Sequence, residues 1–362
     1  MPLNEILKDY RTNLPIERKR NSNFRETLYQ RLKNYEALID FTDNIPPDVE
    51  WGEGKMPFGK RIYELIEGII KTVDAYYEGN PHKAYTILNR TLNLCEMTKI
   101  LNKDLSLAEN SNLFRIRTVN SNYPLSKKEI FHIPFNMRER VATQRYSIPG
   151  LPCLYLANSI YVSWEELGRP SDNIIQASRF CNTRELRLLD LTNDIYSNKY
   201  DAGNNPIENW QLFYYLTIWP LVAACSVKVP DRNATFKPEY IIPQLLLQWI
   251  NKNELDGIKY SSTHIDLNNT NHVGHMYNIV VPVKSFDKDE GYCDELVEMF
   301  KVSSVIPMQL TQIAMNRIVE GDLRNEDLRG IELIEGNRIL YSVSSFGKLE
   351  AQLMKLEPTK IQ

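Results

Sequence analysis

The sequence predicts a protein of mixed α and β structure, with a helical N-terminal part and an α/β remainder. Up to about residue 108, apolar residues recur at steps of three and four, as they do on one face of a helix. From about residue 109 the pattern changes to short apolar runs with long connections, which is typical of strands alternating with helices. We therefore expect a helical domain over 1–108 and an α/β domain with a C-terminal extension over 109–362.

Three helices are expected in the N-terminal domain. The first follows Asn23, which suits an N-cap, and the second carries a wide apolar stripe between Ile62 and Val73. The third begins at Asn80 and Pro81, an N-cap residue followed by a proline in the first turn. Residues 1–22 are polar and mixed in charge, and we expect them to form a loosely packed arm.

The α/β domain is expected to contain short strands and intervening helices. Pro149 and Gly150 form a turn before a strand, and Ser159 suits the N-cap of a short helix after it. Strands are predicted at 113–118, 154–156, 186–192, 224–229, 257–262 and 277–283, and helices at 160–167, 210–221 and 238–251.

Composition restricts the classes of function. The net charge of -3 argues against a general nucleic-acid-binding protein. Five dispersed cysteines without a CxxC pair suggest reduced thiols and a cytoplasmic location. The longest apolar run, 212–229, is broken by polar residues and a proline, so no membrane span is expected. His272 and His275 are three residues apart but no further ligands accompany them, so no metal site is expected.

The stretch from Arg145 to Leu167 contains the residues best suited to chemistry. A cation at Arg145, a phenol at Tyr155 and a carboxylate at Glu166 could meet at one side of a cleft, because a strand leads directly into a helix there. Arginine forks, at Arg145 and at Arg115, match the geometry of a pyrophosphate. A carboxylate beside a ribose stabilises an oxocarbenium-like transition state. These residue types suit cleavage of an N-glycosidic bond next to a pyrophosphate, and NAD is such a molecule.

Three motifs, in order, resemble the signature of the RES domain family, many of whose members are bacterial toxins. The first motif is Leu113-Phe114-Arg115. The second combines Arg145, Tyr155 and Glu166, and the third is the segment 257–262, Gly-Ile-Lys-Tyr-Ser-Ser. The resemblance covers roughly residues 109–290. It implies a fold related to ADP-ribosyltransferases and an enzyme that cleaves the nicotinamide–ribose bond of NAD by hydrolysis or phosphorolysis, with NAD as substrate and no cofactor.

The resemblance also implies roles for individual residues. Arg145 and Arg115 would hold the phosphates or the nicotinamide ribose, Tyr155 would pack on the nicotinamide side, and Glu166 would contact the ribose that Ser262 helps to position. Family spacing favours Glu166 over the adjacent Glu165 and Ser262 over Ser261, and both choices stay open. Tyr146 stands where compact members have Trp, and we expect it to join the pocket.

The N-terminal helices resemble, in pattern and position, the HEPN-like domain that precedes the RES domain in some family members. Ribonuclease versions of that domain carry an arginine, a spacer of four to six residues and then a histidine. His82 is the only histidine within residues 1–108, and Ala75, Tyr76 and Tyr77 occupy the positions of that arginine. We therefore expect a packing or dimerisation module rather than a ribonuclease.

The leading hypothesis is an NAD-consuming bacterial toxin or anti-phage defence effector, with an antitoxin or regulatory protein as partner and a homo-oligomeric state. Two alternatives remain open. One is an ADP-ribosyltransferase that modifies a macromolecule, and the other is a catalytically silent module that binds NAD or a related nucleotide.

Overall fold

The computed structural model describes residues 3–40, 56–98, 106–121, 123–196, 209–251, 253, 255–265, 275–285, 288–310, 330–334 and 337–361. The chain forms two units from interleaved segments. Unit 1 comprises Met1–Leu105, Thr143–Ile148 and Leu189–Leu255, and unit 2 comprises Ser106–Ala142, Pro149–Leu188 and Asp256–Gln362. The expected boundary near residue 108 falls beside the end of the first segment, and the structure groups a second helical segment with the N-terminal helices. The expected mixture of α and β structure is confirmed.

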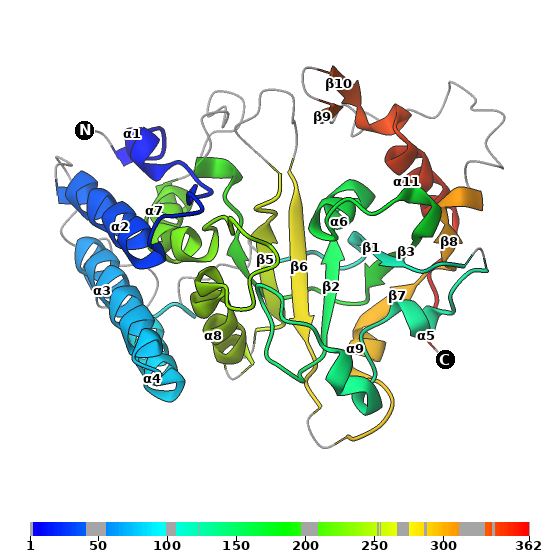
Figure 1. Cartoon of the computed structure of the whole chain (residues 1–362), viewed down its shortest axis with the longest axis horizontal. Coiled ribbons are helices and arrows are strands. Elements are labelled where there is room, and N and C mark those ends of the chain that lie inside the picture. Colours follow the sequence, from blue (N-terminus) through cyan, green and yellow to red (C-terminus); the bar gives the residue numbers. More distant parts are fainter. Residues whose placement is uncertain are drawn as a thin grey trace. The chain divides into compact units, whose positions relative to one another are not determined.

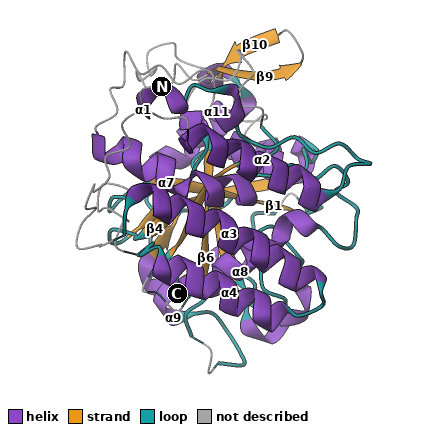
Figure 2. Ribbon diagram, turned by 90° about the vertical axis from the view of Figure 1, so that its left-hand side faces the viewer, coloured by secondary structure: helices purple, strands orange, loops and turns teal. Residues whose placement is uncertain are grey.

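Unit 1 is helical. Its elements are α1 (Leu3–Ile6), the 3₁₀ helix Tyr10–Thr12, α2 (Phe24–Asp40), α3 (Phe58–Tyr77), α4 (Pro81–Leu94), the 3₁₀ helix Asp194–Tyr196, α7 (Asn209–Cys225), the 3₁₀ helix Pro238–Tyr240 and α8 (Ile241–Ile250). Helices α2, α3, α4, α7 and α8 pack side by side (Figure 2). The Asn80 side chain accepts a hydrogen bond from the Lys83 N–H at 3.0 Å, which confirms the expected cap of α4.

Helix α7 runs through Pro220, and the predicted strand over 224–229 is therefore wrong. The helix continues to Cys225, and residues 226–229 are not in a strand. A proline inside a helix leaves the carbonyl four residues earlier without its N–H partner. Here that carbonyl belongs to Leu216, and the buried Tyr35 hydroxyl donates to it at 2.6 Å. The ring of Tyr35 also stacks on Trp219, with 4.1 Å between ring centroids. Tertiary packing thus replaces the missing helical bond.

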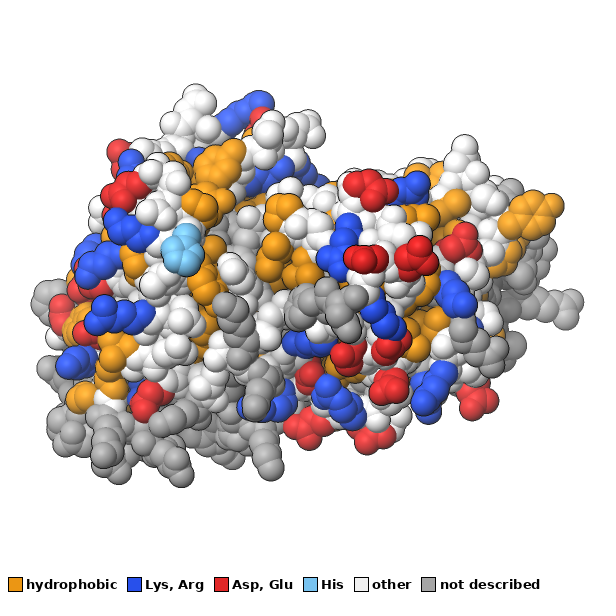
Figure 3. Space-filling view, turned by 90° about the horizontal axis from the view of Figure 1, so that it is seen from below, with side chains coloured by type: hydrophobic (Ala, Val, Ile, Leu, Met, Phe, Trp, Pro, Cys, Tyr) orange, Lys and Arg blue, Asp and Glu red, His pale blue; other side chains and the backbone are white. Residues whose placement is uncertain are grey.

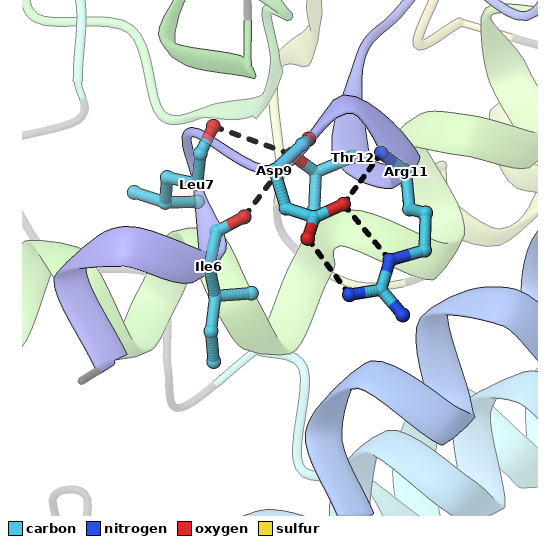
Figure 4. Close-up of polar contacts among 5 residues, drawn as sticks. All are labelled: Ile6, Leu7, Asp9, Arg11 and Thr12. Carbon is cyan, nitrogen blue, oxygen red and sulfur yellow. Dashed lines mark hydrogen bonds and ion pairs between the residues drawn. The ribbon is translucent and has the colours of Figure 1, made fainter. Parts of the chain in front are cut away.

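The N-terminal segment is folded, contrary to the expectation of a loosely packed arm. The Thr12 hydroxyl lies 3.2 Å from the carbonyls of both Ile6 and Leu7, and the Asp9 carboxylate accepts two bonds from the Arg11 side chain and one from its backbone N–H (Figure 4). The Arg11 bond holds the pKa of Asp9 below its usual value. Polar residues here satisfy the backbone locally, while Ile6, Leu7, Leu14 and Ile16 are buried.

Unit 2 contains most of an eight-stranded sheet with the order β4-β5-β6-β2-β1-β3-β7 and with β8 paired to β3, and a separate β10-β9 pair; of β4, only Leu188 belongs to unit 2. The strands are β1 (Asn112–Thr118), β2 (Cys153–Ala157), β3 (Ile175–Asn182), β4 (Leu188–Leu191, where the chain passes into unit 1), β5 (Gly257–Ser261), β6 (Tyr277–Pro282), β7 (Phe300–Val302), β8 (Ile306–Pro307), β9 (Gly330–Ile334) and β10 (Asn337–Leu340). The helices are α5 (Lys127–Ile130), α6 (Ile160–Glu166), α9 (Asp294–Met299) and α11 (Ser345–Lys355), with 3₁₀ helices at Phe135–Arg140, Asp172–Ile174 and Tyr341–Val343.

The sheet divides into two parts where β1 meets β2. These strands pair at one position, Phe114 opposite Ala157, whereas β1 pairs with β3 along its whole length. Figure 1 shows β5, β6 and β2 side by side, with β1, β3 and β7 running across their direction. A core that includes Phe114, Ala157 and residues of α6 and α11 lies on one face of the junction.

The surface shown in Figure 3 carries Lys and Arg side chains intermixed with Asp and Glu, rather than a continuous patch of one sign. Among the described residues, no helix combines the length and the apolar character that crossing a membrane requires.

Candidate active site

Helix α6 presents two adjacent glutamates in different environments. Glu165 is buried, and its carboxylate is paired with Arg169 through two bonds of 2.9 Å. The Glu166 side chain is 29% exposed. Its Oε1 accepts a hydrogen bond from Asn278 Nδ2 at 3.1 Å, and its Oε2 lies 3.9 Å from His264 Nε2. Glu165 is thus engaged within its own helix and the following turn, whereas Glu166 faces residues of β6 and of the segment after β5.

Contacts at its N-terminus and along its buried face fix α6 in place. The Ser159 hydroxyl accepts from the Val162 N–H at 3.1 Å, which confirms the expected N-cap. The Ile160 N–H donates to the Glu350 carboxylate of α11 at 2.6 Å, and the Tyr341 hydroxyl donates to the same carboxylate oxygen. Aliphatic and aromatic side chains of the two helices share one core. The N–H groups in the first turn of a helix lack intrahelical partners, so these acceptors stabilise the N-terminus of α6. They thereby fix the position of the helix that carries Glu166.

Strand β5 carries the third motif along β6. An added Cβ at Gly257 would lie 2.2 Å from the Val280 carbonyl oxygen, so only glycine permits this approach of the two strands. The strand ends at Ser261, and the buried Ser262 follows directly. The Ser262 hydroxyl accepts a hydrogen bond from the His264 N–H at 3.2 Å. The serine therefore shapes the turn that presents His264 toward Glu166.

Strand register places two tyrosines on the sheet face that carries Asn278. Tyr155 is opposite Val280, Ala157 is opposite Asn278, and Asn278 is opposite Tyr260. Directly paired residues of antiparallel strands project to the same face, as do alternate residues of one strand. Burial raises the pKa of Tyr155 well above its usual value, so its phenol is neutral and keeps its proton over the physiological range.

Arg115 lies at the junction of the two parts of the sheet. Its Nη1 donates to the Tyr155 carbonyl at 2.7 Å, where β1 no longer supplies a backbone partner to β2. The buried Nε has no hydrogen-bond partner, and no carboxylate among the described residues forms an ion pair with this guanidinium. Burial lowers its pKa to about 10. Arg115 is therefore a desolvated cation held by a single carbonyl contact, which is the electrostatic condition of an anion-binding group.

Arg145 and Tyr146 belong to unit 1, whereas the residues described above belong to unit 2. Arg145 donates to the carbonyls of Cys225 at 2.9 Å and Val227 at 3.1 Å, and its guanidinium lies over the Tyr240 ring at 5.2 Å. A cation bound to carbonyls at a helix C-terminus is favourable because those carbonyls lack intrahelical partners. Tyr146 is only 1% exposed. Both residues contribute to the packing around the end of α7.

Two residues of the candidate site were not selected from the sequence for their contacts with Glu166. Asn278 lies in a buried strand, where an amide gives no periodic signal, and His264 follows the serines of the third motif. The available indication for Asn278 was that a polar residue directly precedes the apolar run 279–283, within the predicted strand 277–283. His272, the partner of His275 in the weak metal pattern, lies outside the described residues.

Comparison with known proteins gives one informative relative. No family model matches the chain, and no solved structure matches it. A protein of Bacillus subtilis (strain 168) named "Putative toxin YopC" is 30% identical over 361 residues, which covers 95% of this chain and 78% of that protein. Identity at this level over nearly the whole chain establishes common descent and a shared fold, and the chain therefore belongs to the same family as this toxin-named protein.

Proposed function

We propose that this protein is a toxin that consumes NAD by breaking the bond between nicotinamide and ribose. The observation that carries the proposal is the Glu166 carboxylate, which is partly exposed on α6 and oriented by Asn278 beside His264. Arg115 of the same unit adds a desolvated cation suited to a diphosphate. The name of the Bacillus relative supports the toxin part of the proposal.

Cleavage of the nicotinamide–ribose bond does not require a strong general acid. The C1′–N1 bond breaks with its electron pair moving onto the nicotinamide ring, which neutralises the positive charge of the ring. The ribose becomes oxocarbenium-like, and the Glu166 carboxylate stabilises that charge as it develops. Water then adds at C1′ and releases a proton, giving ADP-ribose, or inorganic phosphate adds and gives the ribosyl phosphate. Ser262 and the neutral Tyr155 phenol would bind hydroxyl or amide groups of NAD.

On this proposal unit 2 is a RES domain with a sheet of the ADP-ribosyltransferase kind. The two groups of strands that meet where Phe114 pairs with Ala157 would form that sheet. The helices of unit 1 would serve as the HEPN-like packing or dimerisation module, and an antitoxin would restrain the enzyme in the cell.

Release of nicotinamide from NAD by the purified protein tests the proposal, with and without phosphate. We expect turnover in the parent, and a fall of about 100-fold or more in Glu166→Gln, since removing one electrostatic stabiliser of a transition state costs that much. Glu165→Gln is the matched control: it changes the neighbouring carboxylate, whose partner is Arg169, and we expect most of the activity to survive.

Circular dichroism of each variant would establish that it is folded. Nicotinamide release that is equal in the parent and in Glu166→Gln would refute the assignment of Glu166, and a folded parent without turnover would refute NAD cleavage. ADP-ribose recovered on protein or nucleic acid, rather than free, would move the assignment to transfer.

A further inference from the structure

We infer that Asn278 is the positioning residue of the Glu166 carboxylate, an inference that rests on the proposed function and adds a residue to it. Asn278 is 4% exposed and lies in the second position of β6. Its Nδ2 donates to Glu166 Oε1 at 3.1 Å across 112 residues of sequence. A buried amide whose N–H donates to a partly exposed carboxylate can set the direction of that carboxylate.

The position of Asn278 is fixed by the surrounding backbone. It pairs with Ala157 of β2 on one side and with Tyr260 of β5 on the other. Asn158, directly after β2, accepts from the Tyr277 N–H at 3.1 Å and donates from Nδ2 to the His275 carbonyl at 2.8 Å. The start of β6 is therefore held against the end of β2, which fixes the backbone from which the Asn278 amide reaches Glu166.

An amide suits this task because it orients a carboxylate without adding charge. A hydrogen bond donated to an ionised carboxylate favours the ionised form and fixes the plane of its two oxygens. With Oε1 bound to Asn278, Oε2 is turned toward His264 at 3.9 Å. A bonded lysine or arginine in place of Asn278 would also orient the carboxylate, but it would offset the negative charge that must stabilise a cationic ribose.

The charged and titratable groups around this contact come from several elements. His264 approaches from the segment after β5, and Tyr260 lies on β5 beside Asn278. On α6 itself, Glu165 is neutralised by Arg169. Because an asparagine side chain does not titrate, replacing it by aspartate introduces a new acid at this point and leaves these other groups in place.

Asn278→Asp keeps the size of the side chain and places a second carboxylate against Glu166. Two carboxylates at such a distance share a proton, so the second ionisation moves to higher pH. We expect kcat at neutral pH to fall by about 10- to 100-fold, the value of a hydrogen bond to a charged group. We expect KM for NAD to change by less than about 3-fold, since uniform binding is unaffected. The acidic limb of the kcat–pH profile should move to higher pH, so that activity recovers as pH rises.

Asn278→Ala removes the bond without adding charge, and we expect the loss of kcat without recovery at high pH. Asn93→Asp, at an exposed position of α4, makes the same chemical change away from the site and should keep both kcat and the pH profile. An unaltered kcat and an unaltered acidic limb in Asn278→Asp would overturn the inference.

An NMR titration separates this inference from the proposed function. In protein labelled with ¹³C at glutamate carboxyls, the Glu166 signal is identified by its loss in Glu166→Gln. We expect the Glu166 pKa to be lower in the parent than in Asn278→Ala, and equal values would overturn the inference. If the parent released no nicotinamide while this difference was present, NAD cleavage would fail and the positioning of Glu166 by Asn278 would stand.

Discussion

Replacing Arg115 by methionine should make the free protein more stable. Burial lowers the pKa of Arg115 to about 10, whereas the usual arginine pKa lies above ~12. At about 1.4 kcal/mol per pH unit, this difference corresponds to a desolvation cost of roughly 3 kcal/mol. Methionine fills similar space without a charge, but it leaves the Tyr155 carbonyl without its donor, at a cost of about 1–2 kcal/mol. Because the Arg115 residue as a whole is only partly buried, solvent screening reduces this desolvation cost. The expected net effect is a gain of about 1 kcal/mol.

Urea unfolding and thermal unfolding would measure this change. A gain of this size should raise the midpoint by about 2 °C in a chain of this length. The parent should be stabilised further by ADP-ribose, because on the proposed function its diphosphate pairs with the Arg115 guanidinium, and Arg115→Met should lose that response. Arg184→Met is the contrasting control: Arg184 pairs with Asp256 through bonds of 2.7 and 2.8 Å, and its removal should lower stability.

A loss of stability in Arg115→Met as large as that in Arg184→Met would refute this account. It would show that the guanidinium stabilises the free protein, so that its burial carries no net cost in free energy. An ADP-ribose response preserved in Arg115→Met would separately refute the role of Arg115 in binding diphosphate.

Two further changes test the architecture around the site. Gly257→Ala should destabilise the protein by about 1–3 kcal/mol, because its Cβ would overlap a backbone carbonyl of β6 and the central strands must separate; an unchanged urea midpoint would contradict the close approach. Burial lowers the pKa of His132 to about 4 from an ordinary 6.5, so protons bind the unfolded chain first and stability falls as pH drops from about 6.5 toward 4. We expect a loss of about 2 kcal/mol between pH 7.5 and 5. His132→Phe should flatten this dependence, whereas His82→Gln, at an exposed position of α4, should retain it.

Local signals in the sequence predicted many of the elements. The caps at Asn80 and Ser159, the short helix that ends at Glu166 and the strand that begins at Gly257 all occur as expected. Each depends on a few neighbouring residues, namely a capping side chain or an apolar run bounded by turn residues. An element that depends on contacts between residues close in sequence can be predicted from the sequence alone.

Other parts of the fold depend on distant partners and were missed or wrong. Strand β3 (Ile175–Asn182) was not predicted, because Gln176, Ser178 and Arg179 interrupt its apolar pattern. Each of these polar residues has a hydrogen-bond partner that is distant in sequence: Gln176 bonds to backbone groups of Ser121, Tyr123 and Leu125, Ser178 to Ser303, and Arg179 to Leu356. The continuation of α7 past Pro220 likewise depends on Tyr35, almost two hundred residues away. Such compensation cannot be read from a local window.

The distinction between local and distant contacts also separates the two glutamates of α6. Glu166 and Glu165 are neighbours in sequence, and spacing alone separated them. In the structure they differ in their partners. Arg169, in the next turn, forms an ion pair with Glu165, whereas Asn278, on a strand 112 residues later, donates a hydrogen bond to Glu166. The ion pair of Glu165 is local and stabilises the end of its own helix. The hydrogen bond that orients Glu166 is long-range and joins the helix to the sheet. A carboxylate whose orientation is set by another element, rather than by its own helix, can be held toward a ligand while the helix keeps its own fold. On the proposed function, the long-range partner is therefore the feature that distinguishes the catalytic glutamate from the structural one.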